Sequence, residues 1–244
     1  PIIAKIMALR GIVNREQSRH FFFPNRDKLH SPFLMKNMEK AVVRLHEQIE
    51  SGIGIMVFGD YDVDGTSGTS LLYLFFKSLG VEVNYYIPDR ENEGYGLSKK
   101  GIEYAKYIGA NLLITCDCAI NAFAEIEYAN ELEVDVIITD HHKPDDKLPH
   151  AFAILNPNRY DCDYPFKGLC GTGVAFKFAL AYCEQYGIDP ELVWEHSDLV
   201  AIATAADLVP IIDENRIIVQ DGIKRIKATL NNASIGSTSS TLLP

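Results

Sequence analysis

Residues 55–65 read IMVFGDYDVDG, an apolar run that ends in three acids, Asp60, Asp62 and Asp64. A strand that is apolar throughout is typical of a parallel sheet, where both of its faces are buried. If the chain stays extended beyond the strand, side chains two residues apart point the same way, so the three carboxylates converge. Their repulsion favours a divalent cation, and carboxylate oxygens suit Mg²⁺ or Mn²⁺. The alternative is a solvated acidic loop that caps the following helix.

Strand-like and helix-like segments alternate through the middle of the chain. Strands are predicted at 54–58, 81–87, 111–115, 134–139 and 151–155, with helices between them at 66–79, 98–108 and 121–132. Further helices are predicted at 172–186, 190–207 and 215–227. This order predicts an α/β fold: a parallel sheet of about five strands flanked by helices, with a helical C-terminal segment. The ligand crevice of such a sheet lies outside the carboxyl ends of its strands.

The chain divides into three parts. Residues 1–50 are predicted to form a helical segment that packs on the core, and residues 51–228 form the main α/β domain. Residues 229–244 are rich in Asn, Ser and Thr, which predicts a disordered tail or a truncated linker. The chain begins without Met and ends in low-complexity sequence, so we expect it to be a piece of a longer protein.

The composition narrows the class of protein. The formal net charge is −10 at pH 7, which argues against the broad basic face of a non-specific nucleic-acid binder. No apolar run approaches the ~20 residues that span a bilayer, so we expect no membrane partner. The five cysteines contain no C-x-x-C pair, which argues against a zinc site or a disulfide framework. Buried free thiols are typical of a reducing compartment, so we expect a cytoplasmic protein.

More candidate site residues fall at the ends of predicted elements. Asp117 lies in the sequence CDC after the third strand, and His141 and His142 follow the fourth. Because parallel strands end at the same edge of a sheet, we expect these residues near the first motif. Asp207 ends a mostly apolar run, where a buried carboxylate needs a partner or an ion. The alternatives are ordinary surface polarity for the histidines and a solvated helix end for Asp207.

Two further features suit an anion. Arg90 follows the second strand and is a candidate for binding phosphate, the alternative being a surface salt bridge with Asp89 or Glu93. The stretch GLCGTG at 168–173 opens a helix and can present backbone N–H groups to an anion. It does not match the phosphate-binding loop of nucleotide-binding proteins, and a helix-packing or tight-turn role fits it equally well.

Five motifs follow one another in the order DYDVDG, CDC, DHH, GTGVAFK and ADLVP. In this order they resemble the DHH phosphoesterase superfamily, and the resemblance extends from about Arg15 to Lys227. The DYDVDG form of the first motif, the ADLVP context and the loop PDRENEGYGLS at 88–98 resemble the RecJ type, whose members are single-strand-specific 5′→3′ exonucleases.

The resemblance implies a set of ligands for two Mn²⁺ ions, with Mg²⁺ as a second option. It assigns Asp117 to a position between the two ions and His141 to the first histidine of the DHH signature. The implied ligands are Asp60, Asp62, Asp64, Asp117, His141 and Asp207. The implied catalytic residues are Asp117, His142 and Arg90, of which His142 and Arg90 contact the phosphate that is cut.

The sequence departs from the superfamily pattern at three points. Many members begin the first motif with His where this chain has Gly59, so one metal needs another ligand, such as Asp60. The usual Gly after the second motif is Ala119, which is tolerated if the backbone there does not need a positive φ. The second catalytic-core domain, with its glycine-rich motif, and the OB-fold that grips single strands are missing; both are expected in the full-length protein.

The expected function is metal-dependent hydrolysis of phosphodiester bonds in single-stranded DNA, with 5′→3′ polarity, in DNA repair and recombination. The polarity comes from the resemblance alone. Two alternatives stay open. One is a DHH phosphodiesterase that acts on short oligonucleotides or cyclic dinucleotides, and the other is a non-catalytic DHH-fold scaffold. A scaffold is free to lose its acids, whereas every ligand position is filled in this sequence.

Overall fold

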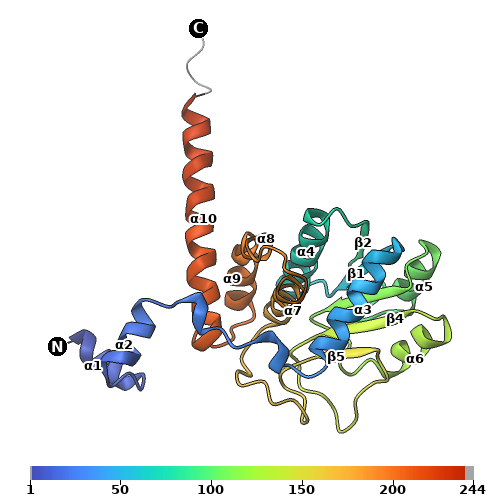
Figure 1. Ribbon diagram of the computed structural model, residues 1–244, viewed down its shortest axis with the longest axis horizontal. Coiled ribbons are helices and arrows are strands. Elements are labelled where there is room, and N and C mark those ends of the chain that lie inside the picture. Colours follow the sequence, from blue (N-terminus) through green and yellow to red (C-terminus); the bar gives the residue numbers. More distant parts are fainter. Residues whose placement is uncertain (1, 240–244) are drawn as a thin grey trace.

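One sheet of five parallel strands forms the centre of the molecule (Figure 1). The computed structural model describes the backbone of residues 2–239 and the side chains of residues 2–230. The strand order is β2-β1-β3-β4-β5. The strands are β1 (Ile55–Gly59), β2 (Val83–Tyr86), β3 (Leu112–Cys116), β4 (Asp135–Thr139) and β5 (Ala153–Leu155). The predicted fold class is confirmed, and each strand ends within one residue of its predicted end.

The register brings three strand ends level with one another. Gly59 at the end of β1 pairs with Cys116 of β3, and Cys116 pairs with Thr139 of β4. The next residues continue this alignment, because the Asp60 N–H donates to the Cys116 carbonyl and the Asp117 N–H donates to the Thr139 carbonyl. Side chains that follow these strands therefore leave the sheet side by side.

Helices cover both faces of the sheet (Figure 1). One face packs against α3 (Met38–Ser51), α4 (Val63–Ser78) and α7 (Gly171–Tyr186). The other face packs against α5 (Lys99–Tyr107) and α6 (Phe123–Glu131). Successive strand residues enter opposite cores, as Val57 and Phe58 do, so a strand buried on both sides has to be apolar throughout.

The first motif turns into a helix sooner than expected. α4 begins at Val63 with Asp62 as its N-cap, whereas the sequence pattern predicts a start at residue 66. The Asp62 carboxylate accepts the Gly65 N–H at 2.9 Å, which ends the extended backbone. The expectation that three carboxylates line one side of an extended segment is therefore wrong. Asp60 and Asp64 are buried, and Asp62 is exposed.

The range 190–207 forms two helices instead of the predicted one. They are α8 (Glu191–Trp194) and α9 (Ser197–Ala206), and the chain turns between them at His196. The turn lets α9 pack closely on α10, since a Cβ added to Gly222 would lie 2.3 Å from the Ser197 carbonyl oxygen.

α10 (Asp213–Ser239) is longer than predicted and extends away from the rest of the molecule (Figure 1). It continues through residues 229–239, where the sequence predicts a disordered tail or linker. The stretch 229–239 contains weak helix formers but no proline, which is the residue that most strongly ends a helix. Residues 240–244 lie outside the described residues.

The first fifty residues form two unlike parts. α3 buries Met38, Val42 and Leu45 in the core, as predicted for this segment. By contrast, α1 (Ile2–Leu9) and α2 (Arg15–Phe22) bury only Met7 and lie beside the base of α10 (Figure 1). Short turns of 3₁₀ helix, η1 (Arg26–Lys28) and η2 (Pro32–Leu34), connect the parts. The division at residues 50 and 228 remains a prediction.

None of the helices in the described part of the chain combines the length and the apolar character that crossing a bilayer requires.

Candidate metal centre

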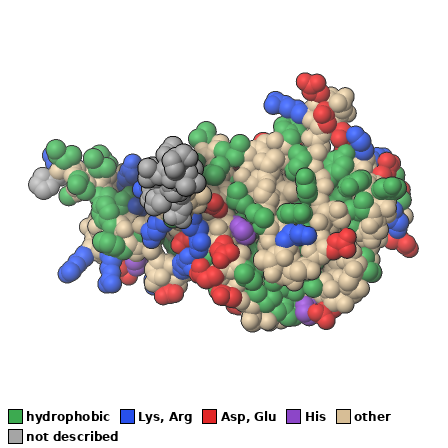
Figure 2. Space-filling model, turned by 90° about the horizontal axis from the view of Figure 1, so that it is seen from above, with side chains coloured by type: hydrophobic (Ala, Val, Ile, Leu, Met, Phe, Trp, Pro, Cys, Tyr) green, Lys and Arg blue, Asp and Glu red, His purple; other side chains and the backbone are tan. Residues whose placement is uncertain are grey.

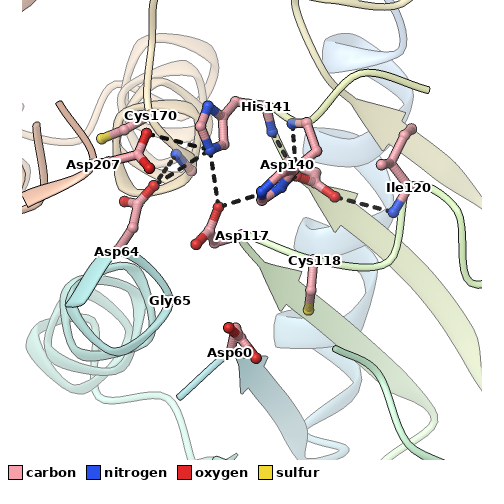
Figure 3. A network of polar contacts seen from close by, with 12 residues as sticks. Asp60, Asp64, Gly65, Asp117, Cys118, Ile120, Asp140, His141, Cys170 and Asp207 are labelled. Carbon is pink, nitrogen blue, oxygen red and sulfur yellow. Dashed lines mark hydrogen bonds and ion pairs between the residues drawn. The ribbon is translucent and has the colours of Figure 1, made fainter. Parts of the chain in front are cut away.

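The acids and histidines that follow the strands gather at one edge of the sheet (Figure 3). Asp60 follows β1, Asp117 follows β3, and Asp140, His141 and His142 follow β4. Asp60, Asp117 and Asp140 are at most 1% exposed. The strand register places them there, because the carboxyl ends of β1, β3 and β4 are level.

His141 lies at the centre of the group. Its Nε2 atom is 3.1 Å from Asp117 Oδ1, 3.6 Å from Asp207 Oδ2 and 3.7 Å from Asp64 Oδ2. Two sets of ligand atoms within 4.8 Å of one another can hold a metal ion: one from Asp117, His141 and His142, and one from Asp64, His141 and Asp207. The structure therefore brings together residues from four of the five sequence motifs.

Several buried polar atoms of the centre have no hydrogen-bond partner in the described structure. They are Asp60 Oδ2, Asp117 Oδ1 and His141 Nε2. Such atoms are rare in folded proteins, because an unpaired buried polar group costs ~1–3 kcal/mol. A carboxylate oxygen and an imidazole nitrogen are both ligands for divalent cations, so an ion would satisfy them. The donor set fits a divalent metal.

The electrostatics of the centre point the same way. Burial, followed by the charges of Asp64 and Asp140, raises the pKa of Asp117. Burial also raises the pKa of Asp60 and of Asp207. Raised values mean that the ionised carboxylates repel one another in a poorly solvated place. A bound cation removes this cost, since it supplies the missing positive charge.

Asp64 is held in place by a helix terminus from another part of the chain. Its two carboxylate oxygens accept the backbone N–H groups of Gly171 at 2.6 Å and Thr172 at 2.8 Å, in the first turn of α7. The Thr172 hydroxyl donates to the Asp64 carbonyl at 2.8 Å. A Cβ at Gly171 would lie 2.6 Å from the Cβ of Asp117, so glycine is required. The GLCGTG turn thus binds an anion, and that anion is Asp64.

Asp140 orients His142. One of its oxygens accepts the N–H groups of His141 at 2.7 Å and His142 at 3.0 Å, and lies 2.8 Å from His142 Nδ1. The other oxygen accepts the Ile120 N–H at 3.0 Å. The hydrogen bond with Asp140 raises the pKa of His142. Burial alone would raise the pKa of Asp140, but the bonds from His142 lower it. His142 is 45% exposed, so its ring is accessible to a substrate.

Arg90 lies outside the cluster of acids and histidines, on an exposed loop. Its guanidinium is 5.2 Å from the centre of the Tyr61 ring. Tyr61 contacts Tyr95 edge to face, and Tyr95 contacts His142 in the same way, each at 6.2 Å between ring centres. Arg90 is therefore linked to the centre through aromatic rings. The expected phosphate contact of Arg90 remains a prediction.

A family model described as "DHH family, N-terminal domain" matches residues 54–204. The chain belongs to the DHH family. The matched range contains every residue of the centre except Asp207, which follows it by three positions.

Relatives of this DHH domain include named exonucleases. The chain is 42% identical over 229 residues to the single-stranded-DNA-specific exonuclease RecJ of Bacillus subtilis (strain 168), a match that covers 94% of the chain and 28% of the relative. A crystal structure of exonuclease RecJ bound to manganese matches with a TM-score of 0.72 and 36% identity, over 80% of this chain and 49% of that one. RecJ from Thermus thermophilus in complex with Mg²⁺ matches with a TM-score of 0.62 and 28% identity, over 91% and 27%. The recognition of a RecJ-type DHH domain is confirmed, and the chain spans about a quarter to a half of these relatives.

The structure explains one departure from the DHH family pattern. A Cβ at Gly59 would lie 1.9 Å from Thr69 Oγ1 and 2.5 Å from the Gly65 carbonyl oxygen. No larger residue, histidine included, fits at this position without a shift of α4. Asp60 Oδ2 is buried and unpaired, so it is available as the additional acid that the sequence predicts.

The second departure has a cost. Ala119 has a φ of +83°, a conformation that favours glycine, and Asp117 has a φ of +62°. The condition under which alanine is tolerated without strain is therefore not met. The loop that carries Asp117 holds a strained backbone next to the candidate ligands.

Sequence reasoning identified the acids and histidines but missed the groups that position them. The contact between Asp64 and α7 joins residues 107 apart in the sequence, and no local pattern reveals it. Asp140 is the residue that orients His142, as the 2.8 Å contact between its Oδ1 atom and His142 Nδ1 shows. Cys170 is the N-cap of α7, a role for which its thiol gives no strong signal.

Proposed function

We propose that this chain is the metal-binding catalytic domain of a nuclease that hydrolyses phosphodiester bonds in single-stranded DNA. The observation that carries the proposal is that carboxylate oxygens of Asp64, Asp117 and Asp207 gather around Nε2 of His141. The substrate class and the 5′→3′ polarity follow the RecJ relatives, as does a role in DNA repair and recombination. Five free cysteines, all buried, support a cytoplasmic location.

The cofactor of this proposal is a pair of divalent ions, Mn²⁺ or Mg²⁺. Crystal structures of RecJ with each metal support divalent metal use. A single imidazole nitrogen ligates one ion, so His141 Nε2 cannot serve both candidate sets. The second ion then needs carboxylates, and we propose Asp117 together with Asp60 and Asp62, which lie outside both sets. Predominantly carboxylate ligands favour Mn²⁺ or Mg²⁺ over zinc.

Each residue has a distinct part in the proposed reaction. Two ions held by these ligands would activate a water molecule and place positive charge next to the phosphate. Asp64 stays fixed because α7 holds both of its oxygens. His142 carries a raised pKa and an exposed ring, so its protonated form can stabilise negative charge on the phosphate. Arg90 can add a second positive charge from the loop at 88–98.

The chain spans 28% of the Bacillus subtilis relative, so the activity of the whole protein includes parts that lie beyond this sequence. A second catalytic-core domain with a glycine-rich motif, and an OB-fold, are the partners proposed within the same polypeptide. Single-stranded DNA is the proposed substrate partner.

Digestion of end-labelled single-stranded DNA tests the proposal. We expect release of short products from the 5′ end with Mn²⁺ or Mg²⁺, none with chelator, and slow digestion of a matched duplex. Asp117→Ala should abolish release and leave the circular dichroism spectrum unchanged. A substrate series from two to thirty nucleotides separates the alternatives, because an enzyme for short oligonucleotides would ignore the long strands. An Asp117→Ala variant that cuts at the parent rate would disprove the assignment.

A further inference from the structure

A cavity of about 770 Å³ lies between the N-terminal helices and the start of α10, separate from the metal centre. Its walls come from α2, η1 and the first turn of α10. The residues that matter for its chemistry are Arg10, Phe21, Lys28, Ile212, Asp213 and Arg216. None of the candidate metal ligands lines it. Figure 2 shows that the lobe formed by the N-terminal helices carries basic and hydrophobic side chains on its surface.

The cavity is basic in a chain that is acidic. Arg10, Lys28 and Arg216 line it, and no ion pair in the described structure involves any of the three. Asp213 is the one carboxylate among its lining residues, and it already lies 3.0 Å from His30 Nε2. The positive charges of the cavity therefore have no acid of their own, although the whole chain carries a net charge of −10.

Two of these cations lie close enough to repel each other. Burial, and then the charge of Arg10, lowers the pKa of Arg216. The Arg216 guanidinium lies 3.5 Å from the centre of the Phe21 ring, and its Nε donates to the Phe21 carbonyl at 2.7 Å. Its terminal N–H groups make no hydrogen bond in the described structure, so they can donate to a ligand. An anion between Arg10 and Arg216 would relieve the repulsion.

We propose that this cavity binds the phosphodiester backbone of the single DNA strand whose end occupies the metal centre, an inference that rests on the proposed function. Proteins that hold single strands combine cationic side chains with aromatic or apolar walls, and Phe21 and Ile212 supply such walls here. A volume of ~300–1,000 Å³ is typical of sites for small organic ligands, so one nucleotide fits.

The chain connects the cavity to the metal centre directly. Asp207 and Asp213 are six residues apart, and six residues span at most about 22 Å even when fully extended. A strand held at its phosphates in the cavity can thus present its end to the centre over a few nucleotides. Leu208, Ile211 and Ile212, which belong to the segment between them, have exposed side chains.

The test is strand binding measured in chelator, where cleavage cannot interfere. Arg10→Gln/Lys28→Gln removes two charges whose side chains hold no ion-pair partner, so the fold should be unaffected. We expect weaker binding of a fluorescent 20-nucleotide strand, with the slope of log affinity against log salt reduced by about 1.4, or ~0.7 for each phosphate that is no longer neutralised. Lys5→Gln/Arg19→Gln is the matched control, because it removes the same charge from α1 and α2 outside the cavity.

Arg216→Gln should weaken binding further. Because the Arg216 guanidinium also packs on the Phe21 ring, the melting temperature of this variant shows whether a loss of stability accounts for the weaker binding. If the two double variants bind with the same affinity and salt slope, the proposal is wrong. It is also wrong if Arg10→Gln/Lys28→Gln changes only competition by inorganic phosphate, since the cavity would then hold a small anion.

Cleavage separates this proposal from the proposed function. Arg10→Gln/Lys28→Gln should cut a dinucleotide at the parent rate and a limiting concentration of the 20-nucleotide strand more slowly. Asp117→Ala should bind the strand like the parent. If Asp117→Ala still cuts, the nuclease assignment fails whatever the cavity binds. If Asp117→Ala does not cut, but Arg10→Gln/Lys28→Gln and Lys5→Gln/Arg19→Gln show the same salt slope, the cavity proposal alone fails.

Discussion

Two buried groups of charge in this molecule are built in opposite ways. In the first, Lys177 Nζ lies 2.7 Å from Glu214 Oε1, with side chains that are 1% and 0% exposed. The Tyr164 hydroxyl donates to the other Glu214 oxygen at 2.6 Å, and the His30 N–H donates to Oε1 at 3.0 Å. Each charge there has an opposite charge and hydrogen bonds from within the chain.

The candidate metal centre is only partly satisfied from within the chain. Asp64 and Asp140 accept backbone N–H groups, whereas Asp60 Oδ2, Asp117 Oδ1 and His141 Nε2 have no hydrogen-bond partner in the described structure. The buried charges of Lys177 and Glu214 have partners within the chain. They hold the fold together, since α10, α7 and the N-terminal segment meet at Glu214. A buried group that does not satisfy itself stores unfavourable energy until a cation binds. Changes at the first should therefore alter stability, and changes at the second should alter activity.

The largest expected effect is on cleavage. His141→Gln removes the imidazole that both candidate ligand sets share, and we expect the rate on single-stranded DNA to fall roughly 1,000-fold, as for a loss of several kcal/mol of transition-state stabilisation. His150→Gln is the matched control, because His150 is exposed and its ring lies 3.1 Å from Glu127 Oε1, away from the candidate ligands. Equal rates for the two variants would remove His141 from the centre. Initial rates with Mn²⁺ give the comparison.

The next largest effect is on stability. Glu214→Ala leaves Lys177 buried without its partner, and we expect a loss of ~3–5 kcal/mol in the free energy of unfolding by urea. Glu91→Ala, at an exposed loop position, should change it by less than ~0.5 kcal/mol. Lys177→Met/Glu214→Leu should recover part of the loss, because it removes both charges but leaves the Tyr164 hydroxyl and the His30 N–H without their acceptor. A Glu214→Ala variant as stable as the parent would contradict the difference between the two buried groups.

Metal binding should stabilise the protein through the candidate metal centre. Mn²⁺ at 100 times its dissociation constant is expected to raise the free energy of unfolding by about 2.7 kcal/mol, and chelator should reverse the change. Asp117→Ala should lose most of this increment, and Glu91→Ala should keep it. The increment is read from melting curves with and without Mn²⁺. An increment of equal size in Asp117→Ala would show that the metal binds elsewhere.

An acid that is paired near the surface should behave in an intermediate way. Arg159, with hydrogen bonds at 2.9 and 3.0 Å, and Lys36 hold the pKa of Asp161 at about 2, below the ordinary 3.8. Because the folded value is the lower one, the stability from Asp161 is present above about pH 4 and is lost as the pH falls towards 2. Asp161→Asn should thus be less stable than the parent at pH 6, with the difference shrinking towards pH 2. A difference that stays constant with pH would exclude the charge as its cause.

The smallest effect concerns the strained loop. Ala119→Gly should stabilise the protein by up to about 1 kcal/mol, since a positive φ costs alanine ~1–2 kcal/mol and glycine loses part of that in chain entropy. Ala110→Gly, in the turn before β3, is a control at a buried alanine for which no positive φ is found. Urea unfolding in chelator measures both. Destabilisation of equal size in the two variants would mean that the loop is not strained by alanine.

The sheet and the candidate ligands could be predicted because their signals are local. Residues 55–59 are apolar throughout, and a polar residue follows each of β1, β3 and β4, so the strand ends and the edge where acids meet follow from the order of the elements. The arrangement around Asp64 could not be predicted, since it depends on Gly171 and Thr172 from a distant helix.

The start of α4 shows a local signal that was available but ambiguous. Asp62 is a good N-cap, but Thr66 at the predicted start is a capping residue too, and local sequence does not decide between them. The positive φ of Ala119 was signalled only by the glycine that is usual at this position in the superfamily, because alanine itself is disfavoured in such a backbone. The continuation of α10 past residue 229 likewise contradicts the composition of that segment.

The bond between Asp64 and the start of α7 limits how the cation can approach. A carboxylate offers about four lone pairs, and two of those on Asp64 already accept N–H groups. Only the remaining lone pairs would be open to the proposed cation, so α7 restricts the side from which Asp64 could bind it. A substitution that shifts α7 along its axis would therefore be expected to weaken metal binding although it changes none of the candidate ligands.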